Sequence, residues 1–280
     1  MAINITPVTN HREREKGIIV YPVYSRRSAG LSIGINLYPD KKSCKFNCPY
    51  CEVFPFSSSA EFSLEQMETD LRAAITSAQE QDIPIKDICF SGNGEPTLSP
   101  DFSDALKTAE EIRSKMASSS QLVVISNGTG LLQTHIFSFL KEMCENPSLN
   151  IWLKLDAGTP EWYQKINRSA LPHDQLIEKI KEFTSSSPVT IQTMLCAING
   201  EPPPEAEAQA WEALVCELAV NAALKKNGGI RKVQLYGKAR PAPEDPLATE
   251  LPVEYLKKRA ASLRCLFVER EITTPVEIYL

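Results

Sequence analysis

The sequence lacks the segments that would tie a chain to a membrane or mark it for export. No apolar run approaches the ~20 residues that a helix needs to cross a bilayer. The first stretch, MAINITPVTNHREREK, is polar and charged from residue 10 onward and has no apolar core of a secretory signal. We therefore expect no membrane partner and a cytoplasmic location, where cysteine thiols stay reduced.

The chain also lacks an excess of positive charge. Its 30 Lys and Arg residues are outnumbered by 35 Asp and Glu residues, so the formal net charge is −5. A chain with this balance is not built to neutralise many phosphate groups. The charge therefore leaves a nucleic-acid substrate open but does not support one.

Histidine is scarce, and the cysteines are unevenly spread. Three of the eight cysteines fall in the stretch SCKFNCPYC, as Cys44, Cys48 and Cys51, while the three histidines are far apart. Pro49 biases Cys48 away from helical geometry, so we expect a loop that wraps around a ligand. In a reducing compartment such a cluster is typical of metal binding rather than of disulfides.

The number of cysteines in the loop favours one kind of metal group. A structural zinc site takes four ligands, usually as two pairs, and no second close pair of Cys or His exists here. Three thiolates on a four-iron cluster leave one iron free to bind a small molecule. Two alternatives stay open: a zinc ion completed by a distant ligand, and three unrelated thiols in a surface loop. The other cysteines are expected to be buried small hydrophobic residues; they are Cys89, Cys144, Cys196, Cys216 and Cys265.

Short β-branched apolar segments alternate with longer segments whose apolar residues recur every three to four positions. The expected strands are 31–38, 85–92, 121–127, 150–156, 188–195 and 231–237. The expected helices are 63–81, 101–117, 131–144, 173–184, 205–226 and 253–264, of which the first opens on a capping box of Ser63 and Gln66. Six strand–helix units in a row predict an α/β fold with parallel strands, either a doubly wound sheet or an incomplete barrel.

We expect a single domain over residues 1–280. It would comprise an N-terminal extension (1–30), a core (31–265) and a C-terminal strand or tail (266–280). In either fold the ligand site lies at the carboxyl ends of the strands. The cysteine loop and several polar motifs follow expected strands, so we expect them to share one rim.

The motif SGNGEPT follows the second expected strand. Gly92 and Gly94 allow a positive φ and a close approach of the backbone to a ligand, and Glu95 adds a charge. The alternative is a simple turn with a solvated glutamate. At the end of the third strand, Ser126 and Asn127 are either ligand contacts or part of an ordinary strand-to-helix turn.

Two further strands carry polar residues that point into the fold. Lys154 and Asp156 lie two positions apart, on one face of the fourth strand. An unpaired charge there is costly, so they either pair with each other or touch a ligand. Gln192 on the fifth strand is a candidate for a ligand contact or for a buried hydrogen-bond network.

The cysteine spacing C-x3-C-x2-C, with Tyr50 before the last cysteine, resembles the signature of the radical S-adenosylmethionine superfamily. Other segments are similar to its branch of wybutosine-type tRNA-modifying synthases and their uncharacterised bacterial relatives. They are PVYSRRSAGLSIGIN, FSGNGEPTLSPDF, ISNGTG, WLKLDAGTPEWYQKINR, IQTML and LYGKARPAPED, and the resemblance covers about residues 18–265.

This resemblance implies a partial (β/α)6 TIM-like barrel, open on one side, with the cofactors at the C-terminal strand ends. It implies a [4Fe–4S] cluster on Cys44, Cys48 and Cys51 whose fourth iron chelates S-adenosylmethionine. Reductive cleavage would then give a 5′-deoxyadenosyl radical that abstracts hydrogen from an unidentified substrate. The implied cofactor-binding residues are Tyr50, Gly92, Gly94, Glu95, Ser126, Asn127, Asp156 and Gln192, and the implied catalytic residues are Lys154 and Asp156.

Gly94 and Glu95 would meet the methionyl ammonium, although Asn93 stands where the family often has glycine. The resemblance also implies a one-electron donor of the flavodoxin or ferredoxin type and a small-molecule or macromolecular substrate. A tRNA-modifying synthase is the main alternative, and the absence of cysteine from residues 1–43 counts against its second cluster. An iron–sulfur sensor is the other alternative, but it would need no S-adenosylmethionine site.

Overall fold

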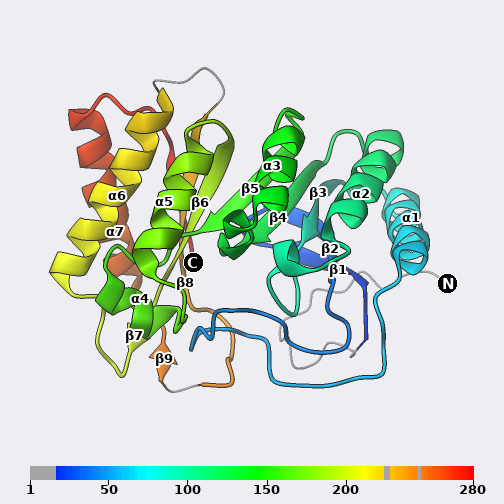
Figure 1. Cartoon of the computed structure of the whole chain (residues 1–280), viewed down its shortest axis with the longest axis horizontal. Helices are drawn as coiled ribbons and strands as arrows, with labels where there is room; N and C mark the ends of the chain where they lie inside the picture. Colours follow the sequence, from blue (N-terminus) through cyan, green and yellow to red (C-terminus); the bar gives the residue numbers. More distant parts are fainter. Residues whose placement is uncertain (1–16, 224–227, 245–246) are drawn as a thin grey trace. The chain divides into compact units, whose positions relative to one another are not determined.

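The structure is a computed structural model, and it describes residues 17–223, 228–244 and 247–280. Residues 1–16 of the expected N-terminal extension lie outside the described residues. The chain forms two compact units (Figure 1). The first holds the residues up to Cys44 together with Val53–Ser126 and Asn146–Asn150. The second holds Lys45–Glu52, Asn127–Glu145 and Ile151–Leu280.

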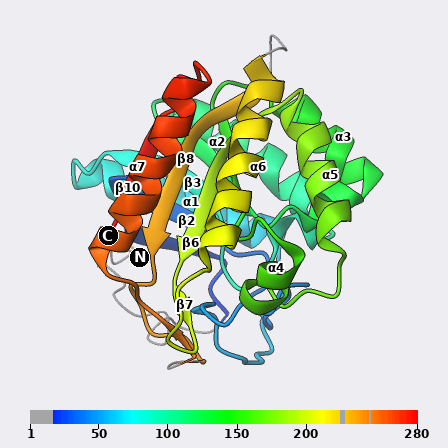
Figure 2. The same cartoon turned by 90° about the vertical axis from the view of Figure 1, so that its left-hand side faces the viewer.

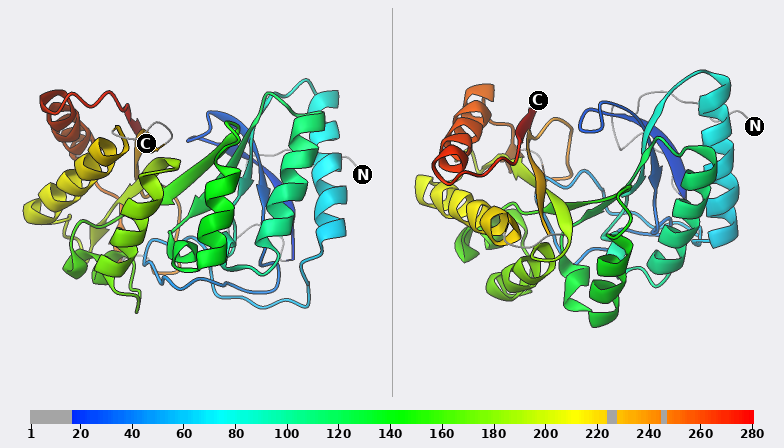
Figure 3. Two further views of the ribbon diagram at one scale, coloured as in Figure 1. Left: turned by 45° about the horizontal axis from the view of Figure 1, so that its top comes forward. Right: turned by 90° about the horizontal axis from the view of Figure 1, so that it is seen from above.

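The first unit contains four strands in the order β1-β2-β3-β4, which are β1 (Val20–Ser25), β2 (Gly30–Ile35), β3 (Ile85–Phe90) and β4 (Gln121–Ser126). The strand β1 runs antiparallel to β2, whereas β2, β3 and β4 are parallel. The helices α1 (Leu64–Glu80) and α2 (Phe102–Met116) lie side by side against these strands (Figures 1 and 3). A short 3-10 turn, η2 (Pro96–Leu98), follows β3.

The N-terminus of α1 forms one of the two hydrogen bonds of the predicted capping box. The Ser63 hydroxyl accepts a hydrogen bond from the Gln66 backbone N–H at 3.2 Å. The Gln66 side chain, however, donates to Asp70 at 2.7 Å, along the helix rather than back to the cap. The apolar face of α1, which includes Met67 and Leu71, is buried because it packs on the strands.

The second unit contains parallel strands in the order β5-β6-β8-β10. These are β5 (Leu149–Lys154), β6 (Pro188–Leu195), β8 (Gly229–Gly237) and β10 (Val276–Tyr279). A separate short pair joins β7 (Ala197–Ile198) and β9 (Ala248–Thr249). The helices are η3 (Thr129–Leu132), α3 (Thr134–Met143), α4 (Pro160–Ile166), α5 (His173–Thr184), α6 (Glu205–Ala223) and α7 (Val253–Glu269). Both α6 and α7 pack along β8 (Figure 2).

All six expected strands are present, and a helix overlapping the expected one follows each of them, which confirms the predicted α/β class. The helix α4 was not expected, and residues 224–226 of the expected helix 205–226 lie outside the described residues. The strand β1 was missed because its residues lie within the expected extension and include Pro22, a residue that sheets tolerate at an edge. The sheet therefore begins before residue 31. The single-domain assignment stays a prediction. Within the described chain, none of the helices combines the length and the apolar character needed to cross a membrane.

Candidate functional site

In the first unit the residue before Cys44 is paired with the glycine motif. The Ser43 N–H donates to the Asn93 carbonyl at 2.8 Å, and the Glu95 N–H donates to the Ser43 carbonyl at 2.9 Å. A Cβ atom at Gly94 would lie 1.8 Å from the Ser43 carbonyl oxygen. Gly94 is thus required because the chain packs against itself at this point.

Gly92 and Asn93 pack against the segment that precedes the cysteine loop, at Asn36 and Tyr38. Gly92 has φ +142°, and a Cβ atom there would lie 2.6 Å from the Asn36 side-chain oxygen. Of the two motif glycines only Gly92 has a positive φ, which corrects the expectation for Gly94. Asn93 donates from its side chain to the Tyr38 carbonyl at 3.0 Å and from its backbone to Asn36 at 3.1 Å. Asn93, at the position where the resembled family often has glycine, thus ties the glycine motif to residues 36–38 through two hydrogen bonds.

Glu95 is buried, with 2% of its surface exposed. Its carboxylate oxygen Oε1 accepts from the Thr97 hydroxyl at 2.5 Å and from the Ser126 hydroxyl at 2.8 Å. The alternative of a solvated glutamate in a simple turn is therefore wrong. The structure brings Glu95 and Ser126 together, and a buried carboxylate held by hydroxyl groups is suited to meet an ammonium group.

In the second unit Asp156 is the centre of a buried polar cluster. Its Oδ1 accepts from the Met194 backbone N–H at 2.9 Å and lies 3.3 Å from the Lys154 Nζ. Its Oδ2 accepts from the Tyr50 hydroxyl and, at 3.1 Å, from the Asn167 Nδ2. The predicted pairing of Lys154 with Asp156 is confirmed, and the carboxylate is satisfied on both oxygens.

Lys154 is held as a cation inside this cluster. Its Nζ lies 4.8 Å from the Tyr50 ring centroid and 5.0 Å from that of Tyr236, and it donates to the Tyr236 hydroxyl at 2.5 Å. Burial opposes the charge, but the Asp156 carboxylate and Tyr236 together raise the pKa of Lys154 above its usual value. Lys154 is therefore suited to attract an anionic group rather than to accept a proton at neutral pH.

The cysteine loop is held by the residue that follows α4. The Cys48 Sγ accepts from the Asn167 Nδ2 at 3.5 Å, and the Asn47 N–H donates to the Asn167 carbonyl at 2.9 Å. The Cys51 N–H donates to the Cys48 carbonyl at 3.0 Å, which forms a turn and confirms the expected loop. Burial, reinforced by the charge of Asp156, raises the pKa of the Cys48 thiol to about 11.

The donor set fits an iron–sulfur group. Cys44, Cys48 and Cys51 form no disulfide and range from exposed to half-buried, and soft sulfur ligands are the ones such a group takes. Cys44 belongs to the first unit and the other two to the second. Among the described residues, no three Cys, His, Asp or Glu side chains are already gathered around a metal position. The ligand assignment thus stays a prediction.

Three other expectations concern Gln192, Asn127 and the cysteines outside the loop. Gln192 donates to the Gln234 side chain at 2.6 Å in a buried pair, which is the network alternative. The Asn127 side chain accepts from the Thr129 N–H at 3.0 Å, as in an ordinary turn. Of the five remaining cysteines, Cys144 is only half-buried and Cys265 is exposed on α7, so the expectation of burial was wrong for both. A ligand role for Gln192 and Asn127 stays a prediction.

Sequence reasoning missed Asn167 and Tyr236 as members of the cluster. Asn167 lies in the segment WLKLDAGTPEWYQKINR, but nothing local marks it. It is 3% exposed and contacts both Asp156 and Cys48. Tyr236 lies at the end of β8. The one signal that pointed to this position was the expectation that the site lies at the carboxyl ends of the strands.

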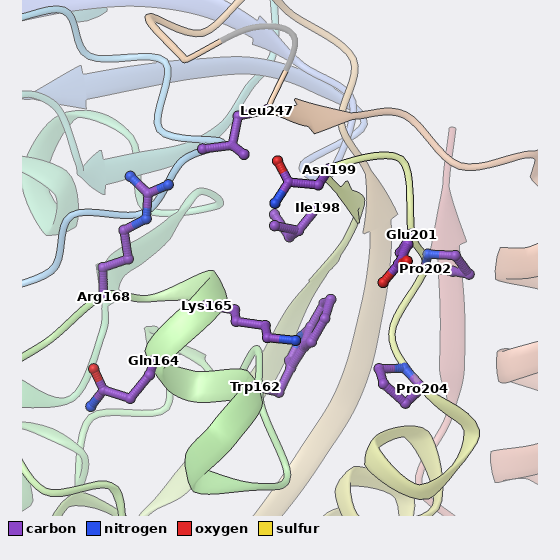
Figure 4. A pocket seen from close by; sticks show the side chains of 10 residues that line it. All are labelled: Trp162, Gln164, Lys165, Arg168, Ile198, Asn199, Glu201, Pro202, Pro204 and Leu247. Atoms are coloured by element: carbon purple, nitrogen blue, oxygen red, sulfur yellow. The ribbon is translucent and has the colours of Figure 1, made fainter.

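The second unit also contains a pocket of about 450 Å³ beside α4 (Figure 4). Figure 4 shows Trp162, Lys165 and Arg168 on one side of it and Asn199 and Glu201 on the other. The remaining lining residues are Gln164, Ile198, Pro202, Pro204 and Leu247. Arg168 is paired with Glu244 at 2.6 Å. The lining combines apolar surface with charges of both signs.

Known proteins resemble this chain in sequence. The chain is 28% identical to a UPF0026 protein of Helicobacter pylori over 168 residues, which are 59% of this chain and 50% of that protein. It is 27% identical to a UPF0026 protein of Synechocystis sp. over 181 residues, which are 62% of this chain and 63% of that protein. The chain therefore spans about half to two thirds of the length of these relatives.

Solved structures share the fold at low identity. SuiB of Streptococcus suis, bound to S-adenosylmethionine, superimposes with a TM-score of 0.65 at 15% identity, over 88% of this chain and 50% of that one. A radical SAM methyltransferase from Sphaerobacter thermophilus gives 0.62 at 15% identity, over 92% and 68%. TYW1 with a bound lysine–pyruvate adduct gives 0.56 at 15% identity, over 83% and 72%.

These likenesses confirm the expected fold, the partial barrel of such enzymes. The model of the Radical SAM superfamily matches residues 40–208, a stretch that covers more than half of the chain and contains the three clustered cysteines, the Gly94–Glu95 motif and Asp156. The chain belongs to the Radical SAM superfamily.

Proposed function

We propose that the chain is a radical SAM enzyme that cleaves S-adenosylmethionine reductively and uses the resulting radical on a substrate still to be identified. Cys44, Cys48 and Cys51 would hold a [4Fe–4S] cluster. When bound, the cluster supplies one electron, taken from a low-potential donor, to break the sulfonium C–S bond and leave methionine and a 5′-deoxyadenosyl radical.

The observation that carries this proposal is the placement of the three cysteines. All three lie in one loop within the region matched by the superfamily, and none of them is in a disulfide. Ser43 is paired with Gly94 at one end of the loop, and Asn167 binds Asn47 and Cys48 further along it. A loop fastened by its backbone is preorganised to present its sulfur atoms.

The chain's own residues would bind and orient the second cofactor. The Glu95 carboxylate, fixed by Thr97 and Ser126, is placed to accept a hydrogen bond from the methionyl ammonium. Tyr50, Gly92, Gly94, Asn127, Asp156 and Gln192 are proposed as further contacts to S-adenosylmethionine.

Lys154 and Asp156 are proposed to act on the substrate side. The pKa of Lys154 is raised, so its ammonium group stays charged and can attract a carboxylate or phosphate of the substrate. Its ammonium group lies over the rings of Tyr50 and Tyr236, and 15% of the side chain remains exposed to an incoming group. Asp156 orients this cation through their ion pair.

The test is to reconstitute the protein with iron and sulfide without oxygen, reduce it with dithionite and measure 5′-deoxyadenosine formed from S-adenosylmethionine. We expect about four iron atoms per chain and product formation that needs the reductant. The Cys48→Ala variant should lose both, whereas Cys265→Ala, which changes an exposed cysteine on α7, should keep both. Absence of product from a fully loaded protein would refute the proposal.

A tRNA-modifying activity is the second candidate, and it rests on the resemblance of several segments to wybutosine-type synthases. The net charge of −5 counts against it. Titration with tRNA at several salt concentrations separates the two, because a chain that neutralises phosphates loses affinity steeply as salt rises. An iron–sulfur sensor is the third candidate, and it would bind the cluster without cleaving S-adenosylmethionine.

We further propose a flavodoxin or ferredoxin as electron donor and the cytoplasm as the location. None of the eight cysteines is in a disulfide, as expected in a reducing compartment. Replacing dithionite with reduced flavodoxin in the same assay tests the donor.

A further inference from the structure

Asn167 occupies a buried position at the end of α4 that faces the cysteine loop. Its backbone N–H donates to the Tyr163 carbonyl at 2.9 Å and closes the helix, and only 3% of the residue is exposed. The conformation of its side chain is therefore set by contacts within the protein.

Two acceptors take hydrogen bonds from the amide nitrogen of this side chain. The Nδ2 donates to the Asp156 Oδ2 at 3.1 Å and to the Cys48 Sγ at 3.5 Å. An amide nitrogen carries two N–H groups, so one donor is available for each acceptor. The Asp156 carboxylate can only accept hydrogen bonds, so the amide must turn its nitrogen, not its oxygen, toward it. The same nitrogen then also faces the Cys48 sulfur.

The backbone of Asn167 is also hydrogen-bonded to the cysteine loop. Its carbonyl accepts from the Asn47 N–H at 2.9 Å. Asn167 thus holds the residue before Cys48 through the main chain and the Cys48 sulfur through the side chain. Because Asp156 also accepts from Tyr50, one carboxylate anchors both Asn167 and the aromatic residue of the same loop.

We propose that Asn167 is a positioning residue for the iron–sulfur group, which places the Cys48 sulfur for iron binding and raises the reduction potential of the bound cluster through an N–H···S hydrogen bond. The inference rests on the proposed function, in which Cys48 is a cluster ligand.

The physical reason is electrostatic. Reduction adds one electron from a low-potential donor to the cluster and breaks no bond, so the negative charge on the sulfur ligands increases. A hydrogen bond to a ligating sulfur stabilises this added charge, and such bonds are among the features that set cluster potentials. The amide of Asn167 donates this bond while remaining uncharged, so it adds no negative charge beside Asp156.

The experiment is an EPR-monitored redox titration of the reconstituted full chain. The variants are Asn167→Ala, which removes the donor, and Asn167→His, which keeps a ring N–H near the same place. Glu161→Gln is the matched control, because Glu161 is exposed at the first turn of α4. Iron content, the chemical unfolding midpoint and 5′-deoxyadenosine formation are measured on each protein.

We expect Asn167→Ala to shift the midpoint potential to a more negative value, Asn167→His to return toward the wild-type value, and Glu161→Gln to match the wild type. Loss of iron from Asn167→Ala, with unfolding unchanged, supports the positioning part of the proposal. A wild-type potential in Asn167→Ala at full iron content would overturn the inference.

The same data separate this inference from the proposed function. If the wild-type protein holds the cluster and Asn167→Ala shifts its potential, yet the wild type cleaves no S-adenosylmethionine, the proposed activity is refuted and the role of Asn167 stands. A wild-type protein that takes up no iron refutes both.

Discussion

Gly94 lies against the backbone of Ser43 so closely that a Cβ atom at Gly94 would be 1.8 Å from the Ser43 carbonyl oxygen. The two residues also form a parallel bridge, which fixes the chain directly before Cys44. The glycine is therefore a packing requirement of the cysteine loop, whether or not a ligand also approaches it.

The Gly94→Ala variant should lose about 1–3 kcal/mol of the free energy of unfolding, because the new methyl group forces the two backbone segments apart. It should also bind less iron on reconstitution. Gly237→Ala is the control: a Cβ atom there would meet Leu256 at an ordinary 3.5 Å. Urea unfolding and iron analysis check both effects, and equal stability of the two variants would contradict this account.

The Asp156→Asn variant should be destabilised by about 3–5 kcal/mol, because it leaves the Lys154 ammonium buried without its counter-charge. The double variant Lys154→Met with Asp156→Asn should regain part of this loss, since no unpaired charge then remains. Glu182→Gln, at an exposed pair with Lys179, should cost less than about 1 kcal/mol. These values follow from urea unfolding, and a loss below 1 kcal/mol in Asp156→Asn would mean that the pair is solvated.

The sequence predicted the elements well because their signals are local. The run QLVVIS is β-branched and apolar, and it forms β4. Pro49 after Cys48 correctly predicted a loop. These patterns depend only on neighbouring residues, so no tertiary information was needed.

The contacts that organise the site were not predictable, because they join distant residues. Asn167 and Cys48 are 119 positions apart, and no periodicity or motif marks an asparagine as a sulfur partner. The same holds for Lys154 and Tyr236, which are 82 positions apart. Sequence reasoning could place Lys154 and Asp156 on one face of a strand, but only the fold brings Tyr50 and Asn167 to them.

His173, at the start of α5, should make the protein less stable in mild acid. Burial lowers its pKa below the ordinary value of about 6.5, so the unfolded chain binds the proton more readily than the folded one. Its contribution to stability is therefore present above pH ~6.5 and is lost as the pH falls through the folded pKa.

We expect the His173→Gln variant to lose this part of the pH dependence. The free energy of unfolding is measured in urea between about pH 5 and 8, and the difference between wild type and variant should shrink on the acid side. His135→Gln, which changes an exposed histidine, serves as the control substitution. A difference that is constant across this range would refute the assignment.

Arg168 stores backbone strain next to Asn167. Its φ is +46°, in the left-handed region, and its N–H donates to the Tyr163 carbonyl at 3.2 Å to close α4. This position usually holds glycine, because a side chain there costs about 1 kcal/mol or more. The side chain lies at the wall of the pocket beside α4 and is paired with Glu244.

Comparison of Arg168→Ala with Arg168→Gly isolates this strain. Both variants lose the ion pair with Glu244, which is partly exposed and contributes little. Only glycine relieves the left-handed conformation, so Arg168→Gly should be more stable than Arg168→Ala by about 1 kcal/mol. Thermal and urea unfolding of the two proteins give this difference directly. Equal stabilities would show that the turn after α4 relaxes without the arginine, and the position of Asn167 would then not depend on it.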